Sequence, residues 1–462
     1  MTSRRAGRIV RQMFGVAAGA ALCAAVLTEA CSRHSSRPEV TAASTAALGT
    51  FNVLTRCYDN TQDCANLYET TLTQSKVAGG GSTLARMSVD DRIFAQPLYA
   101  SGVTIGGTAY NVLYVATMND TVYAFDTATE NLLWHVHYGT PPRSYSTIPG
   151  VVFVAPTTGC TDLSIYEQGN GYPGNVGIEG TPVIDGSTGA MYFVTAVQVT
   201  LDSGAGAMQY WLHSVNITDG SERTNSPVQI TTTGFNELFQ HQRAALVLAN
   251  GTVYVAFASF CDHNPSGGTY HGYVFAYDAT LTNTTPYVFD TTPSVNATTT
   301  CGQGGTCGTQ SICGGGIWQS GAGPSVDSAG NVYVTVGNGL YDGTSLGDSV
   351  VKLAPITLAF DGGTGNFFTP YNQNELVSCD YDLGVSPPTL FPGSSTNLVQ
   401  GGKDGIVSSQ PKRSRRERDK LRHGAVLSKP LPERSAHASD DPLDGAVGLR
   451  ESVRLGIGRR HR

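Results

Sequence analysis

The sequence predicts an all-β fold built from repeated four-stranded units, and three observations support this. Glycine, at 55 of 462 residues, is abundant, while charged residues make up only 14% of the chain, which is typical of short strands joined by turns. Apolar residues alternate along pairs of short segments. This strand–turn–strand unit recurs with Tyr114, Tyr192, Tyr254, Tyr333 and Leu398 at equivalent positions. We therefore expect a β-propeller of about five blades, with loops inserted between strands.

The N-terminal residues 1–31 are typical of an export signal. Four arginines precede the apolar run "FGVAAGAALCAAVL", which is short for a membrane span but suits a signal peptide. Cys31 offers a lipidation site, and residues 32–48 form a Ser/Thr/Ala-rich linker. We expect a periplasmic or extracellular protein, free or lipid-anchored, without a transmembrane helix in the mature chain.

Charge divides the remainder into two parts. Residues 38–410 contain 9 Lys/Arg and 28 Asp/Glu, so the predicted propeller, residues 49–406, should repel nucleic acid. From residue 411 onward the chain has 14 Lys/Arg, 7 Asp/Glu and no Phe, Tyr or Trp. We expect residues 407–462 to be a disordered basic tail that adds no strand, or the product of a shifted reading frame. The propeller would then be incomplete, ending in its fifth unit.

Eight cysteines follow Cys31. An even number in an exported chain predicts disulfides, and Cys57 and Cys64 in "CYDNTQDC" are the nearest local pair.

The segment "AFDTATENLLWHV" resembles the Ala-x-Asp-x-x-Thr-Gly-x-x-x-Trp signature of the pyrroloquinoline quinone (PQQ) repeat, with Glu130 in place of the glycine. In that repeat the tryptophan, here Trp134, packs between adjacent blades. The body of the chain resembles the quinoprotein alcohol dehydrogenase-like superfamily, which implies a propeller of PQQ-type four-stranded blades.

The resemblance also implies a cofactor site. Trp318 in "GGIWQSGAGPSVD" takes the place of the tryptophan on which PQQ stacks, and Asn338 in "TVGNG" that of a Ca²⁺ ligand. Asp380 and Asp382 in "SCDYDLG" are candidates for the catalytic base, which the pattern does not distinguish. Lys403 in "GGKDG" takes the place of a basic residue that contacts the cofactor.

Two more positions complete the implied set, and several features depart from it. Gln198 aligns with a metal-ligating Glu of the superfamily, and Glu179 is a nearby candidate for cofactor binding. The adjacent cysteine pair of the dehydrogenases is reduced to Cys160, and a cofactor-contacting arginine is missing from its usual place. Arg243, one of few cations in the acidic body, is expected to pair with a carboxylate.

Two functions are compatible with these residues. The departures favour a non-catalytic binding or scaffold propeller with an envelope or extracellular protein partner. The alternative is a divergent quinoprotein dehydrogenase that oxidises small alcohols or sugars with PQQ and calcium. Each implied site residue is also compatible with a purely structural role, in blade packing, in a turn or in a loop.

Overall fold

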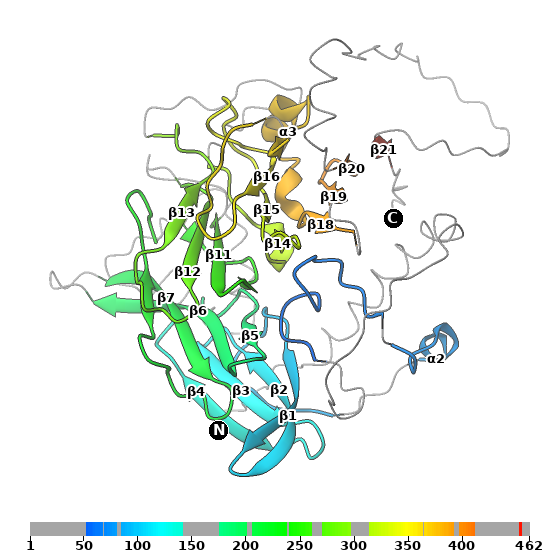
Figure 1. Ribbon diagram of the computed structural model, residues 1–462, viewed down its shortest axis with the longest axis vertical. Helices are drawn as coiled ribbons and strands as arrows, with labels where there is room; N and C mark the ends of the chain where they lie inside the picture. The colour runs from blue at the N-terminus through cyan, green and yellow to red at the C-terminus, as the bar shows by residue number, and fades with distance from the viewer. Residues whose placement is uncertain are drawn as a thin grey trace, which may run out of the picture.

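The computed structural model describes residues 52–67, 69–80, 85–141, 175–200, 206–237, 240–260, 270–296, 314–363, 365–391, 397–411 and 452–454. Within these ranges the chain forms five antiparallel sheets in chain order, which we number 1 to 5. Figure 1 shows them as an arc, with sheet 1 at the blue-cyan end and sheet 5 at the orange end.

Each sheet is a meander of four consecutive strands, and sheet 3 carries one short additional strand. Sheet 1 contains β1 (Leu98–Ile105), β2 (Thr108–Ala116), β3 (Thr121–Asp126) and β4 (Leu132–His137). Sheet 2 contains β5 (Val183–Asp185), β6 (Ala190–Thr200), β7 (Gly206–Asn216) and β8 (Val228–Ile230). Sheet 3 contains β10 (Val247–Ala249), β11 (Thr252–Ser259), β12 (Tyr273–Asp278) and β13 (Tyr287–Asp290), and β9 (Gln240–His241) pairs with β11.

The last two sheets are shorter. Sheet 4 contains β14 (Ser325–Val326), β15 (Val332–Thr335), β16 (Val350–Leu353) and β17 (Phe367–Phe368). Sheet 5 contains β18 (Thr389–Leu390), β19 (Asn397–Gly401), β20 (Ile406–Pro411) and β21 (Ser452–Arg454). Two short α-helices are described, α2 (Gln74–Ala78) and α3 (Gln373–Cys379). None of the helices in these ranges is both long and apolar enough to cross a membrane.

The predicted repeat is confirmed by the strand register. Tyr114, Tyr192, Tyr254, Tyr333 and Leu398 all lie on the second strand of their sheets, opposite the first strand. Three of these tyrosines also link neighbouring sheets. The hydroxyls of Tyr114 and Tyr192 donate to the backbone carbonyls that follow the third strands of sheets 2 and 3, at 2.9 and 2.8 Å. The Tyr254 hydroxyl accepts from the backbone N–H of Ile356, which follows the third strand of sheet 4, at 2.9 Å.

The core consists of separate apolar layers between successive sheets. One layer joins residues of sheets 1 and 2, the next sheets 2 and 3, and two further layers join sheets 3 and 4 and sheets 4 and 5. Because each sheet packs face to face only on its neighbours in the chain, the arrangement is radial, as a β-propeller requires. The predicted all-β propeller fold of about five blades is confirmed.

Trp134 occupies the layer between sheets 1 and 2, as the repeat signature predicts. Its indole Nε1–H donates to the Ile217 carbonyl at 3.1 Å. Its ring lies 5.9 Å from the ring of Tyr114, centroid to centroid. An indole in this place supplies a large apolar area and also satisfies a backbone carbonyl beyond β7.

An N-terminal stretch, residues 52–64, runs along the inner edge of all five sheets, and we call it the axial segment. Val53 pairs with β1, and the Leu54 carbonyl accepts from β5. Asn60 bonds to both β10 and β14, and the Thr61 carbonyl accepts from β18 at 2.9 Å. Figure 1 shows this blue segment on the concave side of the arc. The first strand of every sheet therefore faces the axis, and one short stretch of chain ties the five sheets together.

The Cys57–Cys64 disulfide predicted from the sequence is present in the axial segment. The predicted boundary between propeller and tail, after residue 406, falls within β20. Residues 407–411 belong to β20 and residues 452–454 to β21, so these parts of the predicted tail complete sheet 5. β20 satisfies the edge of β19 and β21 the edge of β20, because any extended segment can pair with unpaired backbone groups irrespective of its composition. The predicted export signal, the linker to residue 48, Cys160 and the rest of the tail lie outside the described residues.

Candidate functional site

Five residues implied by the resemblance lie at the ends of elements in sheets 4 and 5. Trp318 precedes a 3-10 turn, Gln319–Gly321, and Asn338 follows β15. Asp380 caps α3 in a left-handed conformation, with φ of 55°, and Asp382 precedes a second 3-10 turn. Lys403 lies in the turn between β19 and β20. Since β15 and β19 are the second strands of adjacent sheets, their ends lie on the same face of the ring.

Four of these side chains form one polar network. The Asn338 amide Nδ2 donates to Asp380 Oδ1, and its backbone N–H donates to Asp382 Oδ1, both at 2.9 Å. The Lys403 ammonium lies 3.2 Å from Asp380 Oδ1 and also pairs with Asp382 Oδ2. Lys403 therefore bridges both carboxylates, and Asn338 donates one hydrogen bond to each of them.

The structure distinguishes the two aspartates by their exposure, which the sequence pattern did not. The Asp382 side chain is 5% exposed and that of Asp380 is 50% exposed. Burial, followed by the neighbouring Asp382 charge, raises the pKa of Asp380. Burial would lower the pKa of Lys403, but its carboxylate partners outweigh it and raise the pKa to about 12. Asp380 is thus the carboxylate of the pair that solvent can reach, and Asp382 is the buried one.

Trp318 lies beside this network because two glycines let it approach. A Cβ at Gly316 would lie 3.1 Å from the indole Nε1. A Cβ at Gly337 would lie 3.3 Å from Asp382 Oδ1 and 3.6 Å from the indole Cδ1. Trp318 and Asp382 therefore both pack against the backbone of residue 337.

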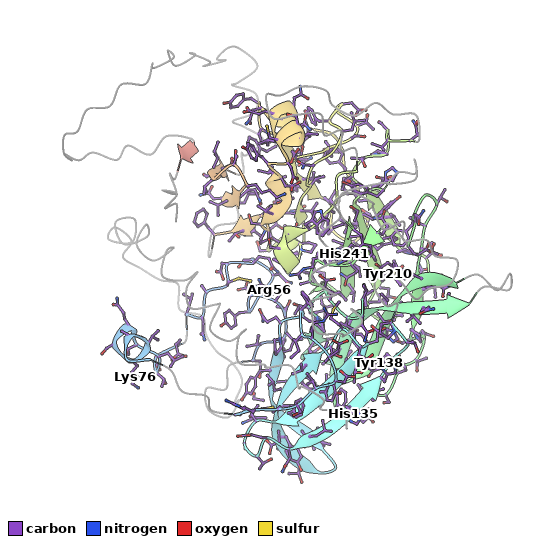
Figure 2. All side chains as sticks on the ribbon, turned by 180° about the vertical axis from the view of Figure 1, so that it is seen from behind. Arg56, Lys76, His135, Tyr138, Tyr210 and His241 are labelled. Carbon is purple, nitrogen blue, oxygen red and sulfur yellow. A yellow bond between two sulfur atoms is a disulfide. The ribbon has the colours of Figure 1, made fainter. Side chains whose placement is uncertain are left out.

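A second polar group lies on the other side of Trp318. The His241 ring meets the indole edge to face, with centroids 5.2 Å apart, and stacks on Phe260 at 4.3 Å. His241 Nε2 is 2.5 Å from Glu179 Oε2, and Glu179 Oε1 is 3.0 Å from Arg243 Nε. The predicted pairing of Arg243 with a carboxylate is confirmed. Figure 2 labels His241 on the inner side of the ring.

Sequence reasoning missed His241, and it missed that Arg243 belongs to this site. The signal available was "QHQR", residues 240–243, in which His241 and Arg243 alternate at the end of β9. Alternation places both side chains on one face of an extended segment. It does not show which carboxylate or which aromatic ring they meet.

Gln198, the other implied metal ligand, is not brought into contact with this network. It lies on β6 in sheet 2, opposite Met208, and its backbone N–H donates to the Thr140 carbonyl at 2.8 Å. Glu179, by contrast, reaches Trp318 through His241. Six of the seven implied residues thus form one contiguous group, with Gln198 apart from it.

The donor atoms allow a test of whether a hard cation fits here. Asn338 is 1% exposed, and its Oδ1 is buried without a hydrogen-bond partner among the described residues. A buried amide oxygen with no partner is costly unless something else satisfies it, and amide and carboxylate oxygens suit Ca²⁺. However, no cluster of three or more His, Cys, Asp or Glu suited to a metal occurs within the described ranges. A cation would therefore depend on Asn338 and the two aspartates.

Comparison with known proteins gives distant structural matches. No family model and no curated protein matches this sequence. Among solved structures, quinohemoprotein alcohol dehydrogenase ADHIIG from Pseudomonas putida HK5 matches 70% of this chain and 41% of its own, with 16% identity and a TM-score of 0.42. The quinohemoprotein alcohol dehydrogenase from Comamonas testosteroni matches 78% and 48%, with 15% identity and a TM-score of 0.48.

BamB from Moraxella catarrhalis matches 72% of this chain and 77% of its own, with 13% identity and a TM-score of 0.25. The chain spans less than half the length of the two dehydrogenases.

Proposed function

We propose that this chain binds a planar quinone of the PQQ type at Trp318 and oxidises a small alcohol or sugar there. One observation carries the proposal: Trp318 lies between the Asn338–Asp380–Asp382–Lys403 network and the Glu179–His241–Arg243 group. The departures noted in the sequence favoured a scaffold. The contiguity of the site residues moves the balance toward the dehydrogenase alternative.

The residues have complementary roles in this proposal. The half-buried indole of Trp318 offers a flat surface for a conjugated ring. The Asn338 Oδ1 and Asp382 would hold Ca²⁺, and Lys403 would stabilise negative charge that develops on ring oxygens. When bound, the quinone would supply the two-electron oxidant and Ca²⁺ a Lewis acid.

Asp380 would accept the proton of the substrate hydroxyl. Its raised pKa makes the carboxylate a stronger base than an ordinary aspartate. The Lys403 ammonium at 3.2 Å keeps the carboxylate ionised and holds its orientation. Because half of this side chain is exposed, a substrate can reach it, which is not so for the buried Asp382.

The test is titration of the purified protein with PQQ, with and without Ca²⁺, followed by dye reduction with methanol, ethanol and glucose. We expect saturable quinone uptake at micromolar concentrations, lost in Trp318→Ala. Trp211→Ala, on β7 in sheet 2, is the matched control and should retain uptake. Asp380→Asn should retain uptake and lose at least a hundredfold in turnover. A folded protein that takes up no quinone would refute the proposal.

The second candidate is a non-catalytic binding module. It is favoured by the bridging of both carboxylates by Lys403 and by the position of Gln198 away from the network. The same experiment distinguishes the two functions. Quinone uptake without dye reduction in any of the substrates would support the binding module over the dehydrogenase.

A further inference from the structure

The axial segment brings an arginine without an ion-pair partner to the inner side of the ring. Arg56 precedes the disulfide, and its Nη1 points at both sulfur atoms, of Cys57 and Cys64. A disulfide sulfur is only a weak acceptor. No carboxylate lies within ion-pair distance of Arg56 in the part of the chain that the structure describes. Figure 2 labels Arg56 on this segment.

A second guanidinium faces the same region. Arg243 uses its Nε for Glu179, and its Nη1 lies 2.0 Å from where a Cβ at Gly321 would stand. The guanidinium therefore lies flat on the backbone of residue 321. Its side chain is 26% exposed, so the region is open to solvent on one side. Among the described residues, no carboxylate pairs with its Nη atoms.

The charges in this region do not balance. Burial, followed by repulsion from Arg243, lowers the pKa of Arg56. An arginine nevertheless stays protonated in a protein. Of the two guanidinium groups, only that of Arg243 is paired with a carboxylate among the described residues, that of Glu179. Partly buried charge of one sign is unfavourable unless a counter-charge is present.

A buried amide beside the arginines points to a ligand independently. Gln62, on the axial segment, is 2% exposed, and neither its Oε1 nor its Nε2 has a hydrogen-bond partner among the described residues. Its Nε2 lies 3.5 Å from where a Cβ at Gly323 would stand. Gly323 lies two residues after Gly321, the glycine that the Arg243 guanidinium contacts. Buried amide groups are normally satisfied, so this one requires a partner.

We propose that Arg56, Arg243 and Gln62 form a binding site for a small oxyanion, either a carboxylate or a phosphate. Each guanidinium group would donate two N–H groups to oxygens of the anion, and the Gln62 amide Nε2 would donate one more hydrogen bond. The bound charge offsets the excess of positive charge. This site is formed in part by the axial segment and does not depend on a bound quinone, so it goes beyond the function proposed above.

The test measures thermal stability and binding heat for inorganic phosphate and for acetate, at constant ionic strength set with NaCl. We expect a saturable rise in melting temperature with at least one of them, and at least tenfold weaker binding in Arg56→Met. Arg223→Met is the matched control, since Arg223 contacts Asn216 near the outer part of sheet 2, and it should bind as the wild type does. The phosphate and acetate arms show which class of anion is preferred.

A second variant keeps the test decisive if Arg56→Met does not fold. Arg56→Lys preserves the charge and loses the planar fork, so it should bind several-fold more weakly than the wild type. Equal affinity of wild type and Arg56→Lys, or the absence of any saturable effect of either anion, would overturn the proposal. Because no quinone is present in this assay, its failure would leave the proposed function untouched.

Discussion

Substitution of Gly220 tests the radial packing on which the site depends. Gly220 follows β7 in sheet 2 and has φ of +73°. A Cβ there would lie 2.8 Å from Trp134 Cζ3 and 2.8 Å from Val136 Cγ2, both on β4 in sheet 1. Gly220→Ala should therefore disturb the contact between the first two sheets as well as strain its own turn.

The size of the effect follows from two separate terms. A left-handed conformation costs a residue with a Cβ about 1–2 kcal/mol. Forcing an additional methyl group into a packed interface costs about 1–3 kcal/mol more. Gly251 is the matched control, because it has φ of +71° and nothing within 4 Å of its Cβ position. We expect Gly251→Ala to cost about 1–2 kcal/mol and Gly220→Ala about 2–5 kcal/mol.

The assay is urea denaturation of the two variants and the wild type, with the free energy of unfolding taken from each transition. A double-mutant cycle with Trp134→Leu isolates the contact. In the Trp134→Leu background, Gly220→Ala should cost less than it does in the wild type but still more than Gly251→Ala, because the close contact with Val136 remains. Equal destabilisation by the two glycine substitutions in the wild-type background would refute the reasoning, because it would mean that Trp134 does not pack on this turn.

Three further predictions concern stability. Tyr192→Phe removes the hydrogen bond to the Ala279 carbonyl, at 2.8 Å, and should cost about 1 kcal/mol in urea denaturation. Replacing Cys57 and Cys64 together by serine opens a loop of sequence separation 7 and should cost about 2–3 kcal/mol, with no added effect of reductant. Lys403→Met should cost about 1 kcal/mol after allowance for its 38% exposure. Because the folded pKa is raised to about 12 from 10.5, this contribution is fully present below pH 10.5 and is lost as pH rises through 12, so the cost should be constant between pH 7 and 9.

Local patterns were sufficient to predict much of the fold. The alternation around the four repeated tyrosines and Leu398 predicted a strand at each of these positions. The repeat signature predicted that Trp134 packs between blades, and the Cys57–Cys64 spacing predicted the disulfide. These features depend on residues close in sequence, or on a contact that recurs in each unit.

The residues of the site were also predicted in part from local patterns, whereas their environments were not. The resemblance indicated Trp318, Asn338, Lys403 and the two aspartates, but the sequence pattern did not separate Asp380 from Asp382. That distinction is a matter of burial, 50% against 5% exposed, and burial depends on which elements cover a side chain.

The sequence by itself therefore determined the class of fold, the repeat, the local disulfide and the residue types of the site. Only the tertiary structure decided that Glu179, His241 and Arg243 meet Trp318, and that the axial segment carries Arg56 to the inner edge of the ring. These contacts join parts of the chain separated by tens to hundreds of residues. Alternation shows which side of a strand a residue occupies, whereas its partner there is set by the order and packing of whole sheets around the axis.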